Sequence, residues 1–372
     1  MKIVISAVNF TEGGPIEILR QAVDSIIKIL PGSEVIVLVN NINLKLNPCA
    51  KLIAYPQCKR SYLIRLLYEY FFFDRLSRLL KPNIWLSLHD ISPRVVCGCQ
   101  AVYMHNPLPF HSFSASDIWF SPFSFVLSKL YWLAYILNIN SNNHVIVQQQ
   151  WMRQRLSRHI RYPSRIVVAH PGWDYQDKLL HKQNTERCKP DKCILFYPAL
   201  PRFFKNFELI IAAASLLDSS INDRLEIRLT ISGNENRYAK AIVNSAKHIH
   251  VIKFMGILSP SEVNRQYLLC DAVLFPSRLE TWGLPLTEAS VRNKTIVVSD
   301  LPYAYESLSH YHNATFLPPN DPSQWATIIT SIVQGSLEGS AKFIRPEIGP
   351  FTPLEPFCQN WDHLWKKLLE NP

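Results

Sequence analysis

Short apolar runs alternate with segments of helical apolar spacing along most of the chain, a pattern that predicts an α/β fold with parallel sheets. We expect buried strands at 2–8, 34–39, 84–88, 101–104, 145–147, 166–169, 193–197, 225–231, 251–255, 272–275 and 294–300. Helical spacing fills several of the intervals, at 16–30, 59–81, 118–139 and 355–369, and from residues 148, 207, 259 and 285 onward.

The length indicates two domains, since a single hydrophobic core rarely extends beyond about 250–300 residues. The chain has 372 residues, and 48% of them are hydrophobic, which is enough apolar material for two cores. A polar, lysine-rich stretch separates the two halves of the pattern. We therefore expect a first domain at 1–172, a linker at 173–192, a second domain at 193–350 and a C-terminal helix at 351–372.

The clearest unit of the pattern spans residues 271–300, which read as strand, loop, helix and strand. Glu280 and Gly283 fall in the loop, at the carboxyl end of a strand, where parallel sheets bind ligands. Pro285 suits the first helical position, which places Glu288 in the first turn. Such a helix start favours an anion, and the two carboxylates can accept hydrogen bonds from sugar hydroxyls. Alternatively, both acids are solvated and merely suit the helix dipole.

Basic residues and glycines follow other predicted strands. Arg202 and Lys205 come after the strand at 193–197, where they are well placed to bind a diphosphate. Solvated surface charges are the alternative interpretation. Gly13-Gly14 and Gly233 form turns after strands, although such turns are equally ordinary connections between a strand and a helix.

Three features of the second half resemble the retaining glycosyltransferases of family 4: Phe-Pro-Ser at 275–277, Gly-Leu-Pro at 283–285 and the Glu280-x7-Glu288 spacing. The resemblance implies the GT-B fold, an α/β architecture of two Rossmann-like parallel-sheet domains that face across a cleft. It also implies that the last helix returns to the N-terminal domain. The resemblance is strong over 193–330 and thinner over 1–175.

The family resemblance assigns roles to individual residues. Residues that bind a nucleotide-sugar donor would be Gly13, Gly14, Arg202, Lys205, Gly233, Gly283, Leu284 and Glu288. Glu280 would hold donor hydroxyls in the catalytic centre. The glycine that the family has before its arginine is Pro201 here, which alters the loop backbone but keeps the basic pair.

Two histidines follow strands of the first half, His89 and His105. The context of His105, Tyr-Met-His-Asn-Pro, resembles that of the histidine that family 4 places next to the donor sugar and the acceptor. We assign His105 as the second catalytic residue and keep His89 as the alternative. Structural histidines are nevertheless more common than catalytic ones.

Positive charge gathers in the first half: residues 1–175 contain 18 Lys and Arg against 9 Asp and Glu, in a chain of net charge +10. This asymmetry suggests an anionic partner, and no recognition motif supports nucleic acid. The basic, aromatic-rich segment 59–81 is typical of a helix on an anionic membrane, or of a core helix with snorkelling arginines. The apolar stretch 118–139 contains Pro122 and Lys129, so we expect a buried or interfacial helix instead of a span.

Other features bear on cofactors and location. The eight cysteines lack the spacing of a zinc site, and no Asp-x-Asp occurs, so we expect no metal. The first strand begins at once, without the features of a signal peptide, which indicates a cytoplasmic protein.

We interpret the sequence as that of a retaining hexosyl- or deoxyhexosyltransferase for lipopolysaccharide O-antigen or capsule. It would move sugar from a nucleotide-sugar to a saccharide or polyprenyl-diphosphate-linked acceptor, as a peripheral protein on the inner face of the cell membrane. Two alternatives stay open. One is a non-catalytic or regulatory relative that binds sugar nucleotide or membrane, and the other is a sugar-nucleotide epimerase or a phosphorylase.

Overall fold

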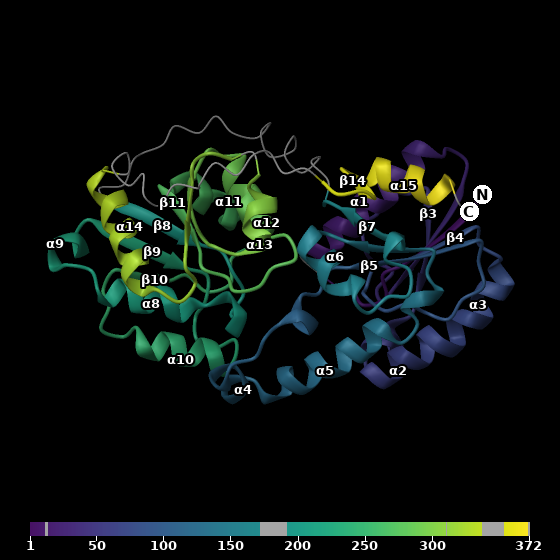
Figure 1. Cartoon of the computed structure of the whole chain (residues 1–372), viewed down its shortest axis with the longest axis horizontal. Helices are drawn as coiled ribbons and strands as arrows, with labels where there is room; N and C mark the ends of the chain where they lie inside the picture. The colour runs from purple at the N-terminus through teal and green to yellow at the C-terminus, as the bar shows by residue number, and fades with distance from the viewer. Residues whose placement is uncertain (12–13, 172–191, 310, 337–352, 371–372) are drawn as a thin grey trace. The chain divides into compact units, whose positions relative to one another are not determined.

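The computed structural model describes residues 1–11, 14–171, 192–309, 311–336 and 353–370, and the chain divides into two compact units (Figure 1). The first unit comprises Met1–Phe110, Leu127–Trp173 and Pro353–Pro372, and the second comprises His111–Val126 and Asp174–Thr352. Residues 111–126, which the sequence pattern places in the first domain, thus group with the second unit. The predicted linker lies outside the described residues, except for Lys192.

The first unit is built on an eight-stranded sheet with the order β14-β7-β6-β5-β4-β1-β2-β3, and each pairing among its described strands is parallel. The strands are β1 (Lys2–Ser6), β2 (Glu34–Val39), β3 (Ala50–Ala54), β4 (Ile84–Ser87), β5 (Cys99–Met104), β6 (His144–Val147), β7 (Ile166–Ala169) and β14 (Phe357–Cys358). The helices are α1 (Gly14–Ile29), η1 (Pro56–Lys59), α2 (Tyr62–Leu67), η2 (Tyr68–Phe72), α3 (Phe73–Leu80), η3 (Leu108–Phe110), η4 (Ile139–Ser141), α6 (Gln150–Ser157), η5 (Pro163–Arg165) and α15 (Trp361–Glu370). Helix α5 (Pro122–Ile136) begins in the second unit and belongs to the first unit from Leu127 onward.

Strand β1 shows how this sheet is covered on both faces. Its side chains alternate with the period of two that a strand imposes. Ile3 and Ile5 are buried with residues of α1 and α15, whereas Val4 is buried with Phe73 of α3 on the other face. Burying each such side chain stabilises the fold by roughly 1.5–3 kcal/mol.

The last helix, α15, packs against α1 in the first unit. The indole N–H of Trp365 donates to the backbone carbonyl of Ala22 at 2.8 Å. Asp362 accepts a 2.6 Å hydrogen bond from Ser25 and forms an ion pair with Lys28 at 3.0 Å. The C-terminal segment is therefore an integral part of the first unit.

Two of the predicted helices are interrupted. The segment 59–81 forms α2, the π-helical turn η2 and α3. The segment 118–139 divides between α4 (Ala115–Phe120) and α5, which begins at Pro122. Proline lacks a backbone N–H and clashes with the preceding turn, so it can begin α5 but cannot continue α4.

The second unit contains a six-stranded parallel sheet with the order β10-β9-β8-β11-β12-β13. Its strands are β8 (Cys193–Tyr197), β9 (Leu225–Leu229), β10 (Ile252–Phe254), β11 (Ala272–Phe275), β12 (Thr295–Ser299) and β13 (Ala314–Leu317). Its helices, besides α4, are η6 (Phe203–Lys205), α8 (Phe207–Ser215), α9 (Ser219–Asn222), α10 (Arg237–Ser245), α11 (Pro260–Leu269), α12 (Leu284–Ser290), α13 (Pro302–Ser307) and α14 (Pro322–Gln334). Ser259 and Glu262 form a capping box at the start of α11, where the sequence pattern predicts a helix.

Both strand orders reverse direction once. In the first unit the chain runs outward from β1 to β3 on one side and from β4 to β7 on the other, and in the second unit the reversal lies between β8 and β11. Connections on opposite sides leave a crevice at the carboxyl ends of the two central strands, where open α/β sheets bind ligands. The loops after β8 and β11 are thus the place to look for a site.

Candidate active site

Lys205 and Glu280 meet at the crevice of the second unit. Lys205 ends η6, which follows β8, and Glu280 lies in the loop after β11. Their side chains form an ion pair, and they are 15% and 11% exposed. The Lys205 ammonium also lies 5.9 Å from the ring centre of Phe204 and 5.6 Å from that of Phe275. A mostly buried cation and carboxylate are therefore held together, with a small part of each open to a ligand.

The backbone around Lys205 is fixed by its neighbours. The hydroxyl of Tyr197, at the end of β8, donates to the Lys205 carbonyl at 2.7 Å and lies 3.0 Å from the hydroxyl of Ser277. Asn206 is fully buried and has a left-handed conformation with φ of 60°. Its side-chain amide donates to the carbonyls of Pro276 and Pro319, at 3.0 and 2.8 Å. The loops after β8, β11 and β13 are thus joined beside the ion pair.

Arg202 is the other predicted basic residue of this crevice. It is exposed, and its guanidinium lies 5.9 Å from the ring centre of Phe204. Among the residues that the structure describes, no acidic side chain forms an ion pair with it. Arg202 therefore presents a planar group of donors to an anion from solvent.

Gly283 is the N-cap of α12, with φ of 80° and ψ of 62°. A Cβ at this position would lie 3.2 Å from Leu286 and 3.4 Å from Phe275, so both the conformation and the space favour glycine. The helix begins at Leu284, so Pro285 occupies its second position and Glu288 its second turn. The sequence analysis expected Pro285 at the first helical position and Glu288 in the first turn. Both residues lie further into the helix than expected, because the helix already begins at Leu284.

Glu288 is held by a buried tyrosine. The hydroxyl of Tyr267, on α11, donates to the Glu288 carboxylate at 2.8 Å. Burial raises the pKa of Tyr267 well above its ordinary value, and the neighbouring Glu288 charge adds to the effect. Tyr267 therefore stays protonated and remains a donor that orients this carboxylate.

Gly233 lies in the loop after β9, with φ of 93°. Its N–H donates to Glu235 at 2.8 Å, and the N–H of Ser232 donates to the other oxygen of the same carboxylate at 2.7 Å. The amides of this loop are thus occupied by a carboxylate of the chain itself. The structure therefore shows that Gly233 allows the positive φ of this loop, and it shows no free amide there for a ligand.

In the first unit, His105 directly follows β5. Its backbone N–H and that of Asn106 donate to the Asp90 carboxylate at 2.7 and 3.0 Å, and the His105 ring lies edge-on to Phe10 at 5.3 Å. The carboxylate of Asp90 thus fixes the loop that carries His105. Gly14 begins α1, and Gly13 lies outside the described residues.

His89 belongs to a fully buried polar cluster at the carboxyl ends of β1 and β4. Its Nε2 lies 2.9 Å from the Ser6 hydroxyl and 3.3 Å from a Glu69 oxygen, and Arg65 donates to its carbonyl at 2.6 Å. Burial and the charge of Arg65 lower the pKa of His89 well below its usual value. Since the side chain is closed off from solvent, the structure does not offer His89 to a substrate.

Glu69 in this cluster should make stability depend on pH. Burial raises its pKa to about 8, despite the opposing charge of Arg65. The folded state then binds a proton more tightly than the unfolded state, so this group's stabilising contribution is lost as pH rises from about 4.5 to 8, by up to about 1.4 kcal/mol per pH unit. We expect the free energy of unfolding of Glu69→Gln, relative to the native protein, to rise through this window. Urea unfolding at pH 5.5, 7 and 8.5 measures the difference, and a constant difference would contradict a raised pKa.

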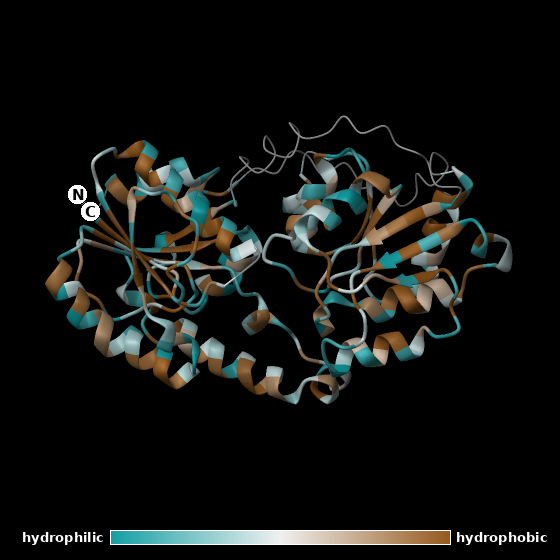
Figure 2. Cartoon of the chain, turned by 180° about the vertical axis from the view of Figure 1, so that it is seen from behind, coloured by the Kyte–Doolittle hydropathy of each residue, from teal (hydrophilic) through white to brown (hydrophobic). Residues whose placement is uncertain are grey.

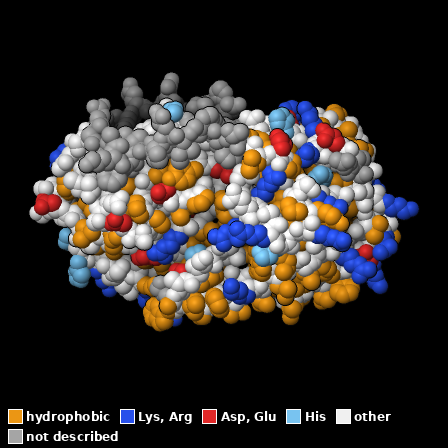
Figure 3. Space-filling view, viewed as in Figure 1, with side chains coloured by type: hydrophobic (Ala, Val, Ile, Leu, Met, Phe, Trp, Pro, Cys, Tyr) orange, Lys and Arg blue, Asp and Glu red, His pale blue; other side chains and the backbone are white. Residues whose placement is uncertain are grey.

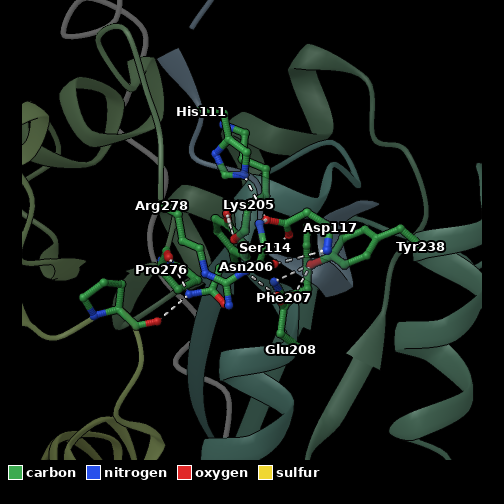
Figure 4. A network of polar contacts seen from close by, with 12 residues as sticks. His111, Ser114, Asp117, Lys205, Asn206, Phe207, Glu208, Tyr238, Pro276 and Arg278 are labelled. Atoms are coloured by element: carbon green, nitrogen blue, oxygen red, sulfur yellow. Dashed lines mark hydrogen bonds and ion pairs between the residues drawn. The ribbon is translucent and has the colours of Figure 1, made fainter. Parts of the chain in front are cut away.

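A second polar network surrounds α4 and was missed by the sequence reasoning (Figure 4). Ser114 and Asp117 form a capping box at the start of α4, and Asp117 lies 3.1 Å from the His111 ring. Arg278, after β11, reaches Asp117 at 3.9 Å and Glu208 of α8 at 2.8 Å. The Ser-x-x-Asp spacing was a local signal for the cap, but its link to Arg278 spans more than 150 residues of sequence.

Burial lowers the pKa of His111, against the opposing effect of Asp117, so the imidazole tends to be neutral. Two further contacts join this segment to the second unit. The His111 ring centre lies 5.0 Å from that of Phe203, and the Arg237 guanidinium lies 4.0 Å from the ring centre of Trp119. These contacts hold residues 111–126 on the second unit, next to η6 and therefore next to Lys205.

The described residues contain no group of three or more His, Cys, Asp or Glu side chains that could hold a metal ion. Seven cysteines fall within the described part of the chain, and each is a free thiol. Burial raises the pKa of Cys97 to about 12 and that of Cys99 to about 11, so these thiols are unreactive at neutral pH.

The chain is similar to known glycosyltransferases. Residues 177–345 match the family described as glycosyl transferases group 1. The O-antigen chain mannosyltransferase RfbU of Salmonella typhimurium is 31% identical over 83 residues, which cover 22% of this chain and 23% of the relative. A D-inositol 3-phosphate glycosyltransferase of Corynebacterium urealyticum is 22% identical over 227 residues, 56% of this chain and 51% of the relative. The chain thus spans between a quarter and half of the length of these relatives.

Solved structures match most of the chain. WaaG, a glycosyltransferase involved in lipopolysaccharide biosynthesis, superposes with a TM-score of 0.64 over 91% of this chain and 92% of its own, at 12% identity. Anabaena Alr3699/HepE in complex with UDP-glucose superposes with a TM-score of 0.60 over 100% and 98%, at 13% identity. These likenesses establish the predicted fold, which is the GT-B fold.

Proposed function

We propose that this GT-B protein, whose second unit carries a group 1 glycosyltransferase domain, is a retaining glycosyltransferase that uses a nucleotide-sugar donor. One observation carries the proposal: a cation and a carboxylate, Lys205 and Glu280, meet at the switch point of that unit's sheet. A nucleotide-sugar needs this pair of chemistries side by side. Its diphosphate is an anion, and its sugar presents hydroxyl donors.

The donor would be bound by loops that the fold has already positioned. Arg202 and Lys205 would bind the diphosphate, together with the backbone at Gly283 and Leu284. Glu280 would accept hydrogen bonds from sugar hydroxyls, and Glu288, held by Tyr267, those of the ribose. Gly13, Gly14 and Gly233 would shape loops near the donor.

Catalysis would depend on the charge that develops on the departing nucleoside diphosphate. Preorganised positive groups are typically the largest contribution to lowering such a barrier. Lys205 fits this role because it is held in place by Glu280 and by its own fixed backbone. His105, on a loop anchored by Asp90, would orient the donor sugar near the attacking hydroxyl.

The acceptor would be a saccharide, lipid-linked through a polyprenyl diphosphate, in the assembly of a surface polysaccharide such as O-antigen. The names of RfbU and WaaG, both concerned with O-antigen or lipopolysaccharide, support this direction. The positive charge of the first half suits both a diphosphate-linked acceptor and the anionic inner face of the cell membrane. The enzyme would therefore work as a peripheral membrane protein in the cytoplasm.

The proposal is tested by incubating the purified protein with UDP-, GDP- and dTDP-sugars, each with and without lipid-linked acceptors extracted from membranes. Transfer with an unchanged anomeric configuration, read by NMR, is the expected result. Hydrolysis of the donor without transfer to any of these acceptors would contradict the proposed acceptor. Conversion of the donor to an isomer would indicate an epimerase. Binding without turnover of any donor would favour a non-catalytic relative.

We further propose that transfer needs no metal ion, since Arg202 and Lys205 supply the positive charge for the diphosphate. Transfer should therefore continue at its full rate in excess EDTA. Loss of activity in EDTA that is restored by Mg²⁺ or Mn²⁺, but not by removal of the chelator alone, would contradict this prediction. The control is a metal-dependent glycosyltransferase assayed in the same buffer.

A further inference from the structure

Helix α5 packs inward mainly through aromatic and hydroxyl-bearing side chains and leaves a row of aliphatic side chains facing outward. The buried residues of α5 are Ser128, Tyr131 and Tyr135. The Ser128 hydroxyl donates to the Leu108 carbonyl at 3.1 Å, and the Tyr135 hydroxyl donates to the Asn106 carbonyl at 2.8 Å. On the outward side of the part that belongs to the first unit, Leu130, Leu133 and Leu137 are 54–58% exposed, and Lys129 is exposed beside them. A helix on a water-soluble unit has the opposite arrangement.

The neighbouring helices continue this surface. The rings of Tyr62 on α2 and Tyr131 on α5 are in contact, with centres 5.7 Å apart, so α2 and α5 meet at these residues. Along α2, η2 and α3, the side chains that point outward are 49–81% exposed and include Leu63, Leu67, Phe71 and Leu79. We call these four residues, together with Leu130, Leu133 and Leu137, the apolar face; all seven belong to the first unit. Figure 2 shows hydrophobic residues recurring along these helices, and Figure 3 shows hydrophobic side chains gathered at the lower right, where Figure 1 places α2.

The charges on these helices identify the partner. The stretches 59–81 and 122–136 contain two acidic residues, of which Glu69 is buried and Asp74 is paired with Arg78 at 3.1 Å. The same stretches carry six exposed cations, namely Lys59, Arg60, Arg75, Arg78, Lys81 and Lys129. In a symmetric dimer, each copy would bring these cations against those of the other. An anionic bilayer offers both hydrocarbon for the apolar side chains and phosphates for the basic ones.

We propose that the apolar face inserts into an anionic lipid bilayer, with α5 lying along the membrane surface. The inference gives the membrane location proposed above a specific surface, and it holds whatever sugar is transferred. Among the described residues, Pro122–Ser141 is the one helical stretch long and apolar enough to cross a bilayer, and 17% of its apolar 18-residue window is buried. The inward hydrogen bonds of Ser128 and Tyr135 hold its other side on the first unit, so the helix lies on the bilayer and does not cross it.

The test compares the full-length protein with the double variant Leu133→Glu/Leu137→Glu. Cosedimentation with vesicles of 70% phosphatidylcholine and 30% phosphatidylglycerol should show at least a tenfold loss of binding for the variant. The matched control is Ile42→Glu/Leu216→Glu, which adds the same charge at exposed apolar positions outside the apolar face and should bind within twofold of the native protein. Because apolar insertion is not screened by salt, the native protein should keep part of its binding in 1 M NaCl.

Three outcomes would overturn the inference. The first is equal vesicle binding by the two double variants. The second is no binding by the native protein, and the third is a native dimer in sedimentation analysis that the apolar-face variant alone dissociates. Thermal unfolding confirms that each variant is folded, since all four positions are exposed. Donor turnover in detergent is measured in parallel, so a protein that binds vesicles but transfers no sugar would refute the proposed reaction and leave this inference intact.

Discussion

Replacing Lys205 with alanine should lower kcat/KM for the nucleotide-sugar donor by about 100- to 1000-fold. The ammonium would contact the diphosphate with a charge-assisted hydrogen bond worth ~1.5–3 kcal/mol. Stabilising the charge that grows on the leaving group adds to this, since one such group is typically worth ~2.7–4 kcal/mol in the transition state. Steady-state kinetics over a range of donor concentrations would show most of the loss in kcat, because the charge is largest in the transition state.

Lys205→Ala would also leave Glu280 as a mostly buried charge without its partner, and this could lower activity by itself. The two causes of lost activity must therefore be separated. A double-mutant cycle with Glu280→Gln does this. If the damage in Lys205→Ala came from the unpaired carboxylate, adding Glu280→Gln would restore activity, whereas a direct role of Lys205 predicts no recovery. Lys240→Ala, at an exposed lysine of α10, is the matched control and should have native kinetics.

The central strands of the second unit, β8, β11 and β12, were predictable because both faces of its sheet are covered there, so continuous apolar runs mark them. β11 and β12 are buried along most of their length and were found at 272–275 and 294–300. β3 was missed, since it lies at the sheet edge and only Ala50 of its residues is buried. β13 and α14 were also missed, although Asp321 followed by Pro322 is a helix-start signal that could have revealed α14.

The site was predictable in its parts but not in its contacts. Arg202, Lys205 and Glu280 were identified separately, because each follows an apolar run that marks a strand. That Lys205 pairs with Glu280 depends on β8 and β11 being neighbours, which only the sheet order establishes. No apolar run pointed to the contact between Asp117 and Arg278. Helix α4 lies in the sequence between strands of the first unit, although it packs with the second. Long-range packing decides such contacts, and local pattern does not report it.

Asn206 should matter more for stability than any residue of the site that touches solvent. We expect Asn206→Ala to lower the free energy of unfolding by about 3–5 kcal/mol. The buried carbonyl of Pro276 and the half-buried carbonyl of Pro319 lose their donor, at about 2–3 kcal/mol together, and a left-handed alanine adds ~1–2 kcal/mol of strain. Urea unfolding followed by tryptophan fluorescence measures the change.

Asn206→Gly separates the two causes, because glycine adopts a φ of 60° without strain but cannot bridge the two carbonyls. Its destabilisation should be smaller than that of alanine by about 1–2 kcal/mol, which is the strain alone. Equal losses in the two variants would show that the left-handed backbone is not the reason for asparagine here. Both variants should also reduce donor turnover in the folded protein, since Asn206 adjoins Lys205 and joins its loop to the loop that precedes Glu280. Native turnover in a folded Asn206→Gly protein would mean that the Lys205–Glu280 pair keeps its position without this bridge.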